Sequence, residues 1–256
     1  MLGPRPHLAP ATLVSILAFF ASASAEAQSG VPRDAYIWLS ASSTVELPGR
    51  TQIAVEMHER RFAQSWRPHQ RVYRGHFAYQ ISRTGRLGFG YTHFLQGAVV
   101  DSGADQPFAA EVRPHVQFDL GRSLSPAARL TQRSRLEYRD WRASSGRAPM
   151  SAVRLRHRVQ LDWTPNGGPI GLRISDELHI QTGDRPASRL FEQNRVQVGL
   201  RVPITGSLST ELAYLWWYQQ RRDGATVQRD HFRIAFEHLH RRRDTSSIDR
   251  SPNAQR

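Results

Sequence analysis

Two residue types are missing from this sequence, which contains neither cysteine nor lysine. The lack of cysteine excludes disulfides and thiolate metal sites, so an exported protein of this sequence would fold without covalent cross-links. The lack of lysine makes all 35 basic residues arginine, and the formal net charge is +13. A coding bias explains this composition, but arginine also suits bidentate pairing with carboxylates and phosphates in poorly hydrated places.

Long apolar runs are also scarce. Residues 11–20 form one, between Arg5 and the Ala-x-Ala cleavage site Ala25-Glu26-Ala27, and this pattern is typical of a secretory signal peptide. A cut after Ala25 is the alternative. Nowhere later does the chain approach the roughly eighteen apolar residues of a membrane helix, so a membrane location would require a barrel.

We therefore expect a signal peptide over 1–27, a β-barrel domain over 28–239 and a basic, disordered tail over 240–256. The mature chain of about 229 residues fits a single all-β domain. Export argues against the nucleic-acid partner that such a positive charge would otherwise suggest. The expected partners are the outer-membrane bilayer and anionic lipid headgroups or anionic solutes.

What the sequence has in abundance is alternation of apolar and charged residues. Over 111–120 every even position is apolar and every odd one is charged or polar, and the pattern recurs over 153–163 and 170–174. Successive side chains of a strand point to opposite faces, so these segments are strands with one apolar and one ionic face. They are long enough for a tilted membrane crossing.

Eleven strands are predicted in this way. They lie near 35–46, 51–60, 71–82, 86–96, 110–120, 129–141, 152–163, 170–181, 190–202, 208–219 and 229–239. Short turns rich in Pro, Gly and Asn alternate with longer loops near 61–70, 97–109, 142–151, 182–189 and 220–228, as in outer-membrane barrels.

We predict an all-β, antiparallel up-and-down transmembrane β-barrel of about 10–12 strands. Single-chain bacterial barrels have an even number of strands, which conflicts with eleven. Two solutions are open: residues 35–60 are not two strands, or ten strands close the barrel and the first segment has another role.

The two faces of the strands allow two orientations. In a membrane barrel the ionic face fills most of a narrow lumen as an arginine–glutamate network, whereas a soluble periplasmic barrel would turn the apolar face inward. Strand length, loop alternation and aromatics near strand ends favour the membrane orientation. The predicted lumen network comprises Glu111, Arg113, Arg133, Arg135, Glu137, Arg139, Arg154, Arg156, Arg158, Glu177, Arg195 and Glu211. The aromatics assigned to girdles are Tyr36, Trp38, Tyr138, Trp141, Trp163, Tyr214, Trp216, Trp217 and Tyr218.

Four charged motifs follow one another along the chain. They are Glu111-x-Arg113-Pro-His-Val-Gln117, Arg133-Ser-Arg135-Leu-Glu137-Tyr-Arg139, Arg154-Leu-Arg156-His-Arg158 and Phe191-Glu-Gln193-Asn194-Arg195-x5-Arg201. With Gly90-Tyr91 before them and Leu212-Ala213-Tyr214 after, the series resembles the bacterial domain of unknown function 2490 family. The resemblance implies an outer-membrane-type β-barrel of Gram-negative bacteria with no established activity and no catalytic residues. The basic tail departs from the terminal aromatic residue usual in outer-membrane barrels.

Polar residues interrupt the apolar face of four consecutive strands at Ser134, His157, Asp176 and Asn194. If Trp163 pairs with Ile170, His157 lies opposite Asp176, and Ser134, His157 and Asp176 form the nucleophile–base–acid series of a hydrolase. A histidine–aspartate hydrogen bond, or a bulge that turns Asp176 inward, explains the same residues.

No cofactor and no metal are expected. The histidines are scattered without His-x3-His spacing, and Gly88-Phe89-Gly90 lies inside a strand and not in a phosphate-binding loop.

The functional hypothesis is a structural or envelope-related outer-membrane barrel that binds anionic molecules. A small anion-selective pore, an outer-membrane lipid hydrolase and a soluble periplasmic binding protein are the alternatives. The sequence leaves the oligomeric state open.

Overall fold

The computed structural model describes residues 33–97, 109–141, 150–165, 168–183, 190–221 and 223–241. The predicted signal peptide and nearly all of the predicted tail lie outside these residues. The described part of the chain is all-β. Its strands are β1 (Arg33–Leu47), β2 (Thr51–Phe62), β3 (Pro68–Gln80), β4 (Gly85–Gln96), β5 (Ala109–Ser125), β6 (Ala128–Trp141), β7 (Met150–Trp163), β8 (Gly171–Thr182), β9 (Phe191–Pro203), β10 (Leu208–Gln220) and β11 (Thr226–His240).

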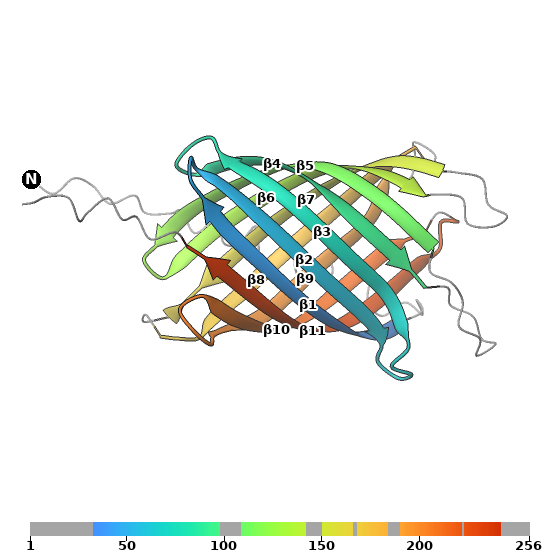
Figure 1. Cartoon of the computed structure of the whole chain (residues 1–256). Coiled ribbons are helices and arrows are strands. Elements are labelled where there is room, and N and C mark those ends of the chain that lie inside the picture. Colours follow the sequence, from blue (N-terminus) through green and yellow to red (C-terminus); the bar gives the residue numbers. More distant parts are fainter. Residues whose placement is uncertain are drawn as a thin grey trace, which may run out of the picture. The chain divides into compact units, whose positions relative to one another are not determined.

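The strands form one closed barrel in which each strand pairs with its neighbours in sequence. Figure 1 shows them tilted against the barrel axis and wrapped around it. The ring closes between β1 and β11, which run parallel from Arg33 opposite Gln228 to Val45 opposite His240. An odd ring of otherwise antiparallel strands can close only through one parallel pair. Both solutions offered for residues 35–60 are therefore wrong, because β1 and β2 are full members of the barrel.

The strand bounds agree with the alternation, apart from some ends. β5 continues through Gly121 to Ser125, where the sequence suggested a turn, because Gly121 pairs with Thr131 and Arg122 with Leu130. β3 begins at Pro68, three residues earlier than expected. A register shift between Arg60 and Arg61 marks the point where this extra length joins β2.

The outward face of the barrel is apolar. Thirty large hydrophobic side chains in the described residues are exposed, and they come from the ten strands β2 to β11 and from some of the connections between strands. Those near the strand centres include Val55, Phe89, Val116, Leu136, Leu155, Val198, Leu212 and Phe232. The inverted orientation, with apolar residues inside, is therefore not the one that the fold adopts.

Not all predicted girdle aromatics lie on this outer face. Tyr36, Trp38 and Trp217 are buried inside the barrel, with exposed fractions of 1%, 8% and 4%. Their strands alternate in the phase that points these rings inward and their neighbours, such as Ile37 and Trp216, outward. Assigning these three residues to a girdle was wrong.

Candidate functional site

The barrel encloses a cavity of about 1260 Å³, so side chains do not fill the interior completely. Its lining runs along most of the strand length, from Asp34 to Thr44 on β1 and from Val227 to Leu239 on β11. Sixteen arginines line it, against seven aspartates and glutamates. Four more carboxylates lie behind the lining in ion pairs, those of Asp119, Glu137, Asp162 and Glu211. The wall of the lumen is therefore rich in arginine even after all these carboxylates are counted.

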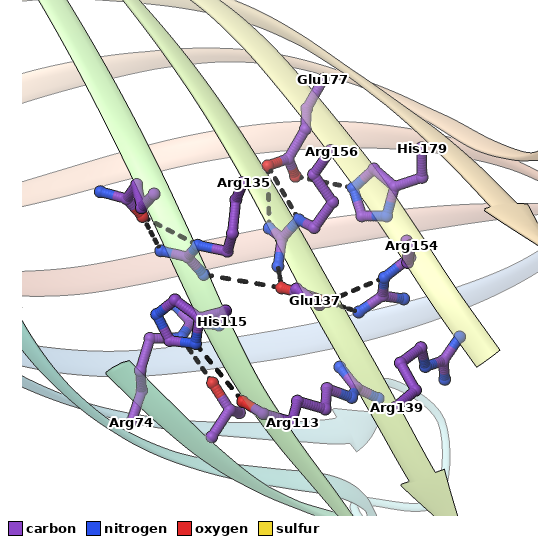
Figure 2. A network of polar contacts seen from close by, with 12 residues as sticks. Arg74, Arg113, His115, Arg135, Glu137, Arg139, Arg154, Arg156, Glu177 and His179 are labelled. Atoms are coloured by element: carbon purple, nitrogen blue, oxygen red, sulfur yellow. Dashed lines mark hydrogen bonds and ion pairs between the residues drawn. The ribbon is translucent and has the colours of Figure 1, made fainter. Parts of the chain in front are cut away.

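One side of the wall is an arginine–glutamate network, which Figure 2 shows in part. We use this name for Glu111, Arg113, Glu137, Arg139, Arg154, Arg156, Glu177 and Glu192. These residues come from β5 to β9, and all of them except Glu192 point inward because they occupy alternate positions on their strands. All predicted lumen residues in this set face the interior.

The Glu111 carboxylate accepts hydrogen bonds from two arginines. Arg113 donates two hydrogen bonds of 2.7 Å to its carboxylate, and Arg139 donates one of 2.9 Å from Nη2. Arg139 also donates a hydrogen bond of 3.0 Å to Glu192. Such forked pairs are the strongest charge-assisted hydrogen bonds that proteins form.

Glu137 lies at the centre of the network (Figure 2) and is 1% exposed. Arg154 donates to it from Nε at 2.9 Å, and Arg156 donates from Nη1 at 2.8 Å. Arg156 then bridges to Glu177 with a hydrogen bond of 2.8 Å from Nη2. Each carboxylate thus joins arginines of neighbouring strands.

Glu192 belongs to this network, but its position in the sequence pattern does not indicate it. The register between β8 and β9 shifts where His179 pairs with Gln193 and Ile180 with Phe191. Glu192 is the extra residue of this bulge and is buried. Because strict alternation would turn it outward, only the bulge brings it to Arg139 and Arg154.

A second charged group lies nearer the short turns. Arg173 contacts Asp162 at 2.7 Å, Glu211 at 2.9 Å and Glu237 at 2.8 Å. Arg233 contacts Glu211 at 2.9 Å. These pairs connect β7, β8, β10 and β11, so they cross-link strands as the network does.

The other predicted arginines of β6 and β7 have fewer carboxylate partners. Arg133 lies opposite Arg158, and Arg135 opposite Arg156, across β6 and β7. Arg133 pairs with Asp119 at 2.6 Å, whereas Arg135 bonds Gln117 and lies 3.8 Å from Glu137. Arg158 has no hydrogen bond or ion pair within the residues that the structure describes. Like charges placed opposite each other repel, so this part of the wall favours an added anion.

On the other side of the lumen lies an arginine–tryptophan wall, which we define as Trp38, Arg60, Arg195, Trp217 and Arg229. The Arg60 guanidinium lies 4.0 Å from the Trp38 ring centroid, and that of Arg195 lies 3.9 Å from the Trp217 centroid. Arg60 and Arg229 each lie 5.3 Å from the Trp217 centroid. Stacking on the rings holds these cations in place by a cation–π attraction.

Two cations of this wall lack a counter-charge. Arg60 donates a hydrogen bond to Gln70 and Arg229 donates one to Gln219, and neither has a carboxylate within ion-pair distance in the described part of the chain. Arg195 has Glu177 at 3.5 Å. The Nε groups of all three arginines are buried without an acceptor among the described residues. The prediction from sequence included Arg195 and missed Arg60, Arg229 and both tryptophans.

On the outer face, the predicted hydrolase series is only partly assembled. Ser134 lies opposite His157, with 2.9 Å between Oγ and Nδ1. Trp163 pairs with Leu172, however, and His157 lies opposite Leu178. Asp176 instead accepts a hydrogen bond of 2.7 Å from Asn194. The assumed register of β7 and β8 was wrong by two residues, and no acid among the described residues forms a hydrogen bond or ion pair with His157.

Histidines inside the barrel pack against aromatic rings. His231 stacks on Tyr36 with 5.0 Å between centroids and on Trp217 with 5.1 Å. Across the described ranges, no three His, Asp or Glu side chains are grouped so that they could hold a metal ion. No helix in the same ranges is long and apolar enough to cross a membrane.

Comparisons with known proteins identify one family. The family model described as "Protein of unknown function (DUF2490)" matches residues 35–228, from β1 into β11, and confirms the resemblance carried by the charged motifs. Among solved structures, a chain titled "NanC porin structure in rhombohedral crystal form" is 11% identical, with a TM-score of 0.45. The match covers 73% of this chain and 85% of that chain. A comparison with curated proteins finds no match.

Proposed function

The chain belongs to the DUF2490 family of proteins of unknown function, and we propose that it is an outer-membrane barrel of a Gram-negative cell whose lumen binds and passes anionic solutes. The membrane location is supported by the apolar outer face. Monomeric soluble proteins rarely expose apolar patches larger than a few hundred Å², whereas here exposed apolar side chains lie on ten consecutive strands, β2 to β11. The strands are 12 to 17 residues long, which exceeds the roughly 9–11 that a tilted crossing needs.

The observation that carries the anion proposal is the arginine surplus in an open lumen. Most carboxylates of the wall are already held by two or more arginines, so they do not offset Arg60, Arg158 and Arg229. Inside a low-dielectric wall, unpaired charge of one sign focuses the field and concentrates counter-ions. An anion in the cavity supplies the missing acceptors.

The arginine–glutamate network serves a different purpose in this proposal. Its arginines and carboxylates neutralise one another and connect five strands, so it stabilises the wall. The arginine–tryptophan wall faces the same cavity with two guanidinium groups, those of Arg60 and Arg229, that have no carboxylate partner among the described residues, and it is the preferred anion site. Guanidinium forks suit carboxylates and phosphates alike, so either class of solute fits the site.

A titration with inorganic phosphate in detergent micelles tests the site, with tryptophan fluorescence as the readout. Trp38 and Trp217 lie against the arginines, so phosphate binding changes their emission. The double variant Arg60→Gln/Arg229→Gln is expected to bind phosphate at least about tenfold more weakly, because the loss of about 1.4 kcal/mol corresponds to tenfold in affinity. Arg83→Gln, which changes an exposed turn arginine, is the matched control and should leave binding unchanged. Equal binding by all three proteins would contradict the proposed site.

A further inference from the structure

The outer face carries a polar stripe, which we define as Ser134, His157, Asp176 and Asn194. Ser134, His157 and Asp176 lie near the centres of β6, β7 and β8, and Asn194 continues the stripe onto β9. The positions two residues away on the same strands are exposed apolar side chains, those of Leu136, Leu155 and Leu178. The stripe therefore crosses the apolar outer face at its mid-height.

The hydrogen bonds within one copy satisfy only part of this stripe. Ser134 forms a hydrogen bond with Nδ1 of His157, and Asn194 donates a hydrogen bond to one oxygen of Asp176. Nε2 of His157 has no partner among the described residues, and Asp176 forms no ion pair there. His157 and Asp176 are diagonal neighbours, since His157 lies opposite Leu178 and Asp176 opposite Val159. Diagonal neighbours have Cα atoms roughly 7–8 Å apart, and no hydrogen bond or ion pair joins these two side chains in the described structure.

An imidazole and a carboxylate whose hydrogen bonding is incomplete are unfavourable on a lipid-facing surface. Ionisable residues at membrane depth are rare, and they pair with one another or mark a functional site. Lipid headgroups lie at the membrane surfaces and do not reach the strand centres. The groups that meet the stripe must therefore belong to another protein with polar side chains at the same depth.

We propose that the stripe is the contact between two copies of this chain in the membrane. A two-fold axis along the membrane normal keeps every residue at its own depth and makes the interface self-complementary. With the axis between β7 and β8, His157 of each copy faces Asp176 of the other. A second copy supplies both the matching depth and the opposite charge. The surrounding apolar residues Leu155, Val159 and Leu178 then pack around this pair. This inference rests on the membrane orientation of the proposed function, but not on anion binding.

Because the chain contains no cysteine, single cysteines can locate the contact. Leu178→Cys lies beside the stripe on β8, and Met57→Cys lies at a similar height on β2, across the barrel. Both side chains are exposed, at 37% and 54%. Oxidation of native membranes should give a disulfide-linked dimer with Leu178→Cys and none with Met57→Cys. Equal cross-linking of both variants, or of neither, would overturn the proposal.

Substitutions of the stripe test the chemistry of the contact. In mild detergent, sedimentation equilibrium should give a dissociation constant at least about tenfold higher for Asp176→Leu than for the unchanged protein. His157→Asp alone should weaken the dimer in the same way, and the exchange His157→Asp/Asp176→His should restore it. If Asp176→Leu associates as tightly as the unchanged protein, the stripe is not the contact.

A gel shift on heating separates this result from a failure of the membrane proposal. A folded barrel that shifts on heating but stays monomeric contradicts only the dimer. A chain recovered in the soluble periplasmic fraction contradicts the membrane proposal on which the dimer rests.

Discussion

At the scale of single residues, the interior depends on how each buried carboxylate is surrounded. Glu137 receives Arg154 and Arg156, and Arg135 lies 3.8 Å away, so one negative charge serves three cations. Taking charges out of water is costly, and this cost is recovered only when the geometry and the hydrogen bonds are nearly complete. Removing the carboxylate leaves Arg154 with Glu192 and Arg156 with Glu177 as their remaining carboxylate partners.

Glu137→Gln is therefore expected to lower the free energy of unfolding by about 3–5 kcal/mol. Urea unfolding in micelles, followed by the gel shift on heating, measures the change. Asp223→Asn is the control, since Asp223 pairs with Arg221 at 3.7 Å and its side chain is 59% exposed. An exposed pair contributes about 0–1 kcal/mol, so the control should unfold nearly like the unchanged protein. Equal losses in both variants would show that burial of the network does not matter.

At this scale the sequence predicts which residues face inward better than how they bond. Alternation alone places Glu111, Glu137 and Glu177 on one face. It does not indicate Glu192, because a bulge breaks the alternation, or the arginine–tryptophan wall, because ring stacking joins strands far apart in sequence. For Trp38 and Trp217 the sequence does contain a usable signal. Each is adjacent to an outward-facing apolar residue, Leu39 or Trp216, and side chains at adjacent strand positions point to opposite faces, so each tryptophan is expected to point inward.

At the scale of elements, β4 is shaped by glycines that make room for two rings. His76 and His115 stack with 5.6 Å between centroids and an interplanar angle of 6°. A Cβ atom on Gly90 would lie 2.4 Å from the carbonyl oxygen of Gly75 and 2.7 Å from Nε2 of His115. The backbone of β3 would have to move to admit it.

Gly90→Ala should therefore destabilise the barrel by about 1–3 kcal/mol, the usual cost of overpacking. Gly75→Ala is the matched control on the adjacent strand, because a Cβ atom there meets nothing within 4 Å. Glycine in a strand is less favourable than alanine by about 0.5–1 kcal/mol, so the control should be neutral or slightly stabilising. Thermal unfolding of both variants checks the contrast, and an equal change in the two would refute the steric reason.

The elements also show where prediction from sequence ends. The strands follow from alternation, because one face of each is apolar and the other ionic. The register of β7 and β8 does not, since it depends on the conformation of the chain between Trp163 and Gly171. A two-residue error there placed Asp176 opposite His157, when the carboxylate in fact bonds Asn194.

At the scale of the whole molecule, the pair of strands that closes the barrel could not be predicted from the sequence. Eleven strands were predicted, but the pairing of β1 with β11 joins the two ends of the barrel in parallel. Alternation within a strand carries no information about the strand with which it pairs. The closed ring then fixes which arginines share the lumen, including the pairs between β8, β10 and β11.

Whether the arginine-rich lumen admits anions is decided by the reversal potential of the purified protein in a planar bilayer. Under a KCl gradient we expect a measurable conductance with a reversal potential displaced toward the equilibrium potential of chloride. Raising the ionic strength should reduce the preference, because salt screens the field of the wall. A cation-selective current, or no current from protein that shifts on heating, would rule out an anion path through the lumen.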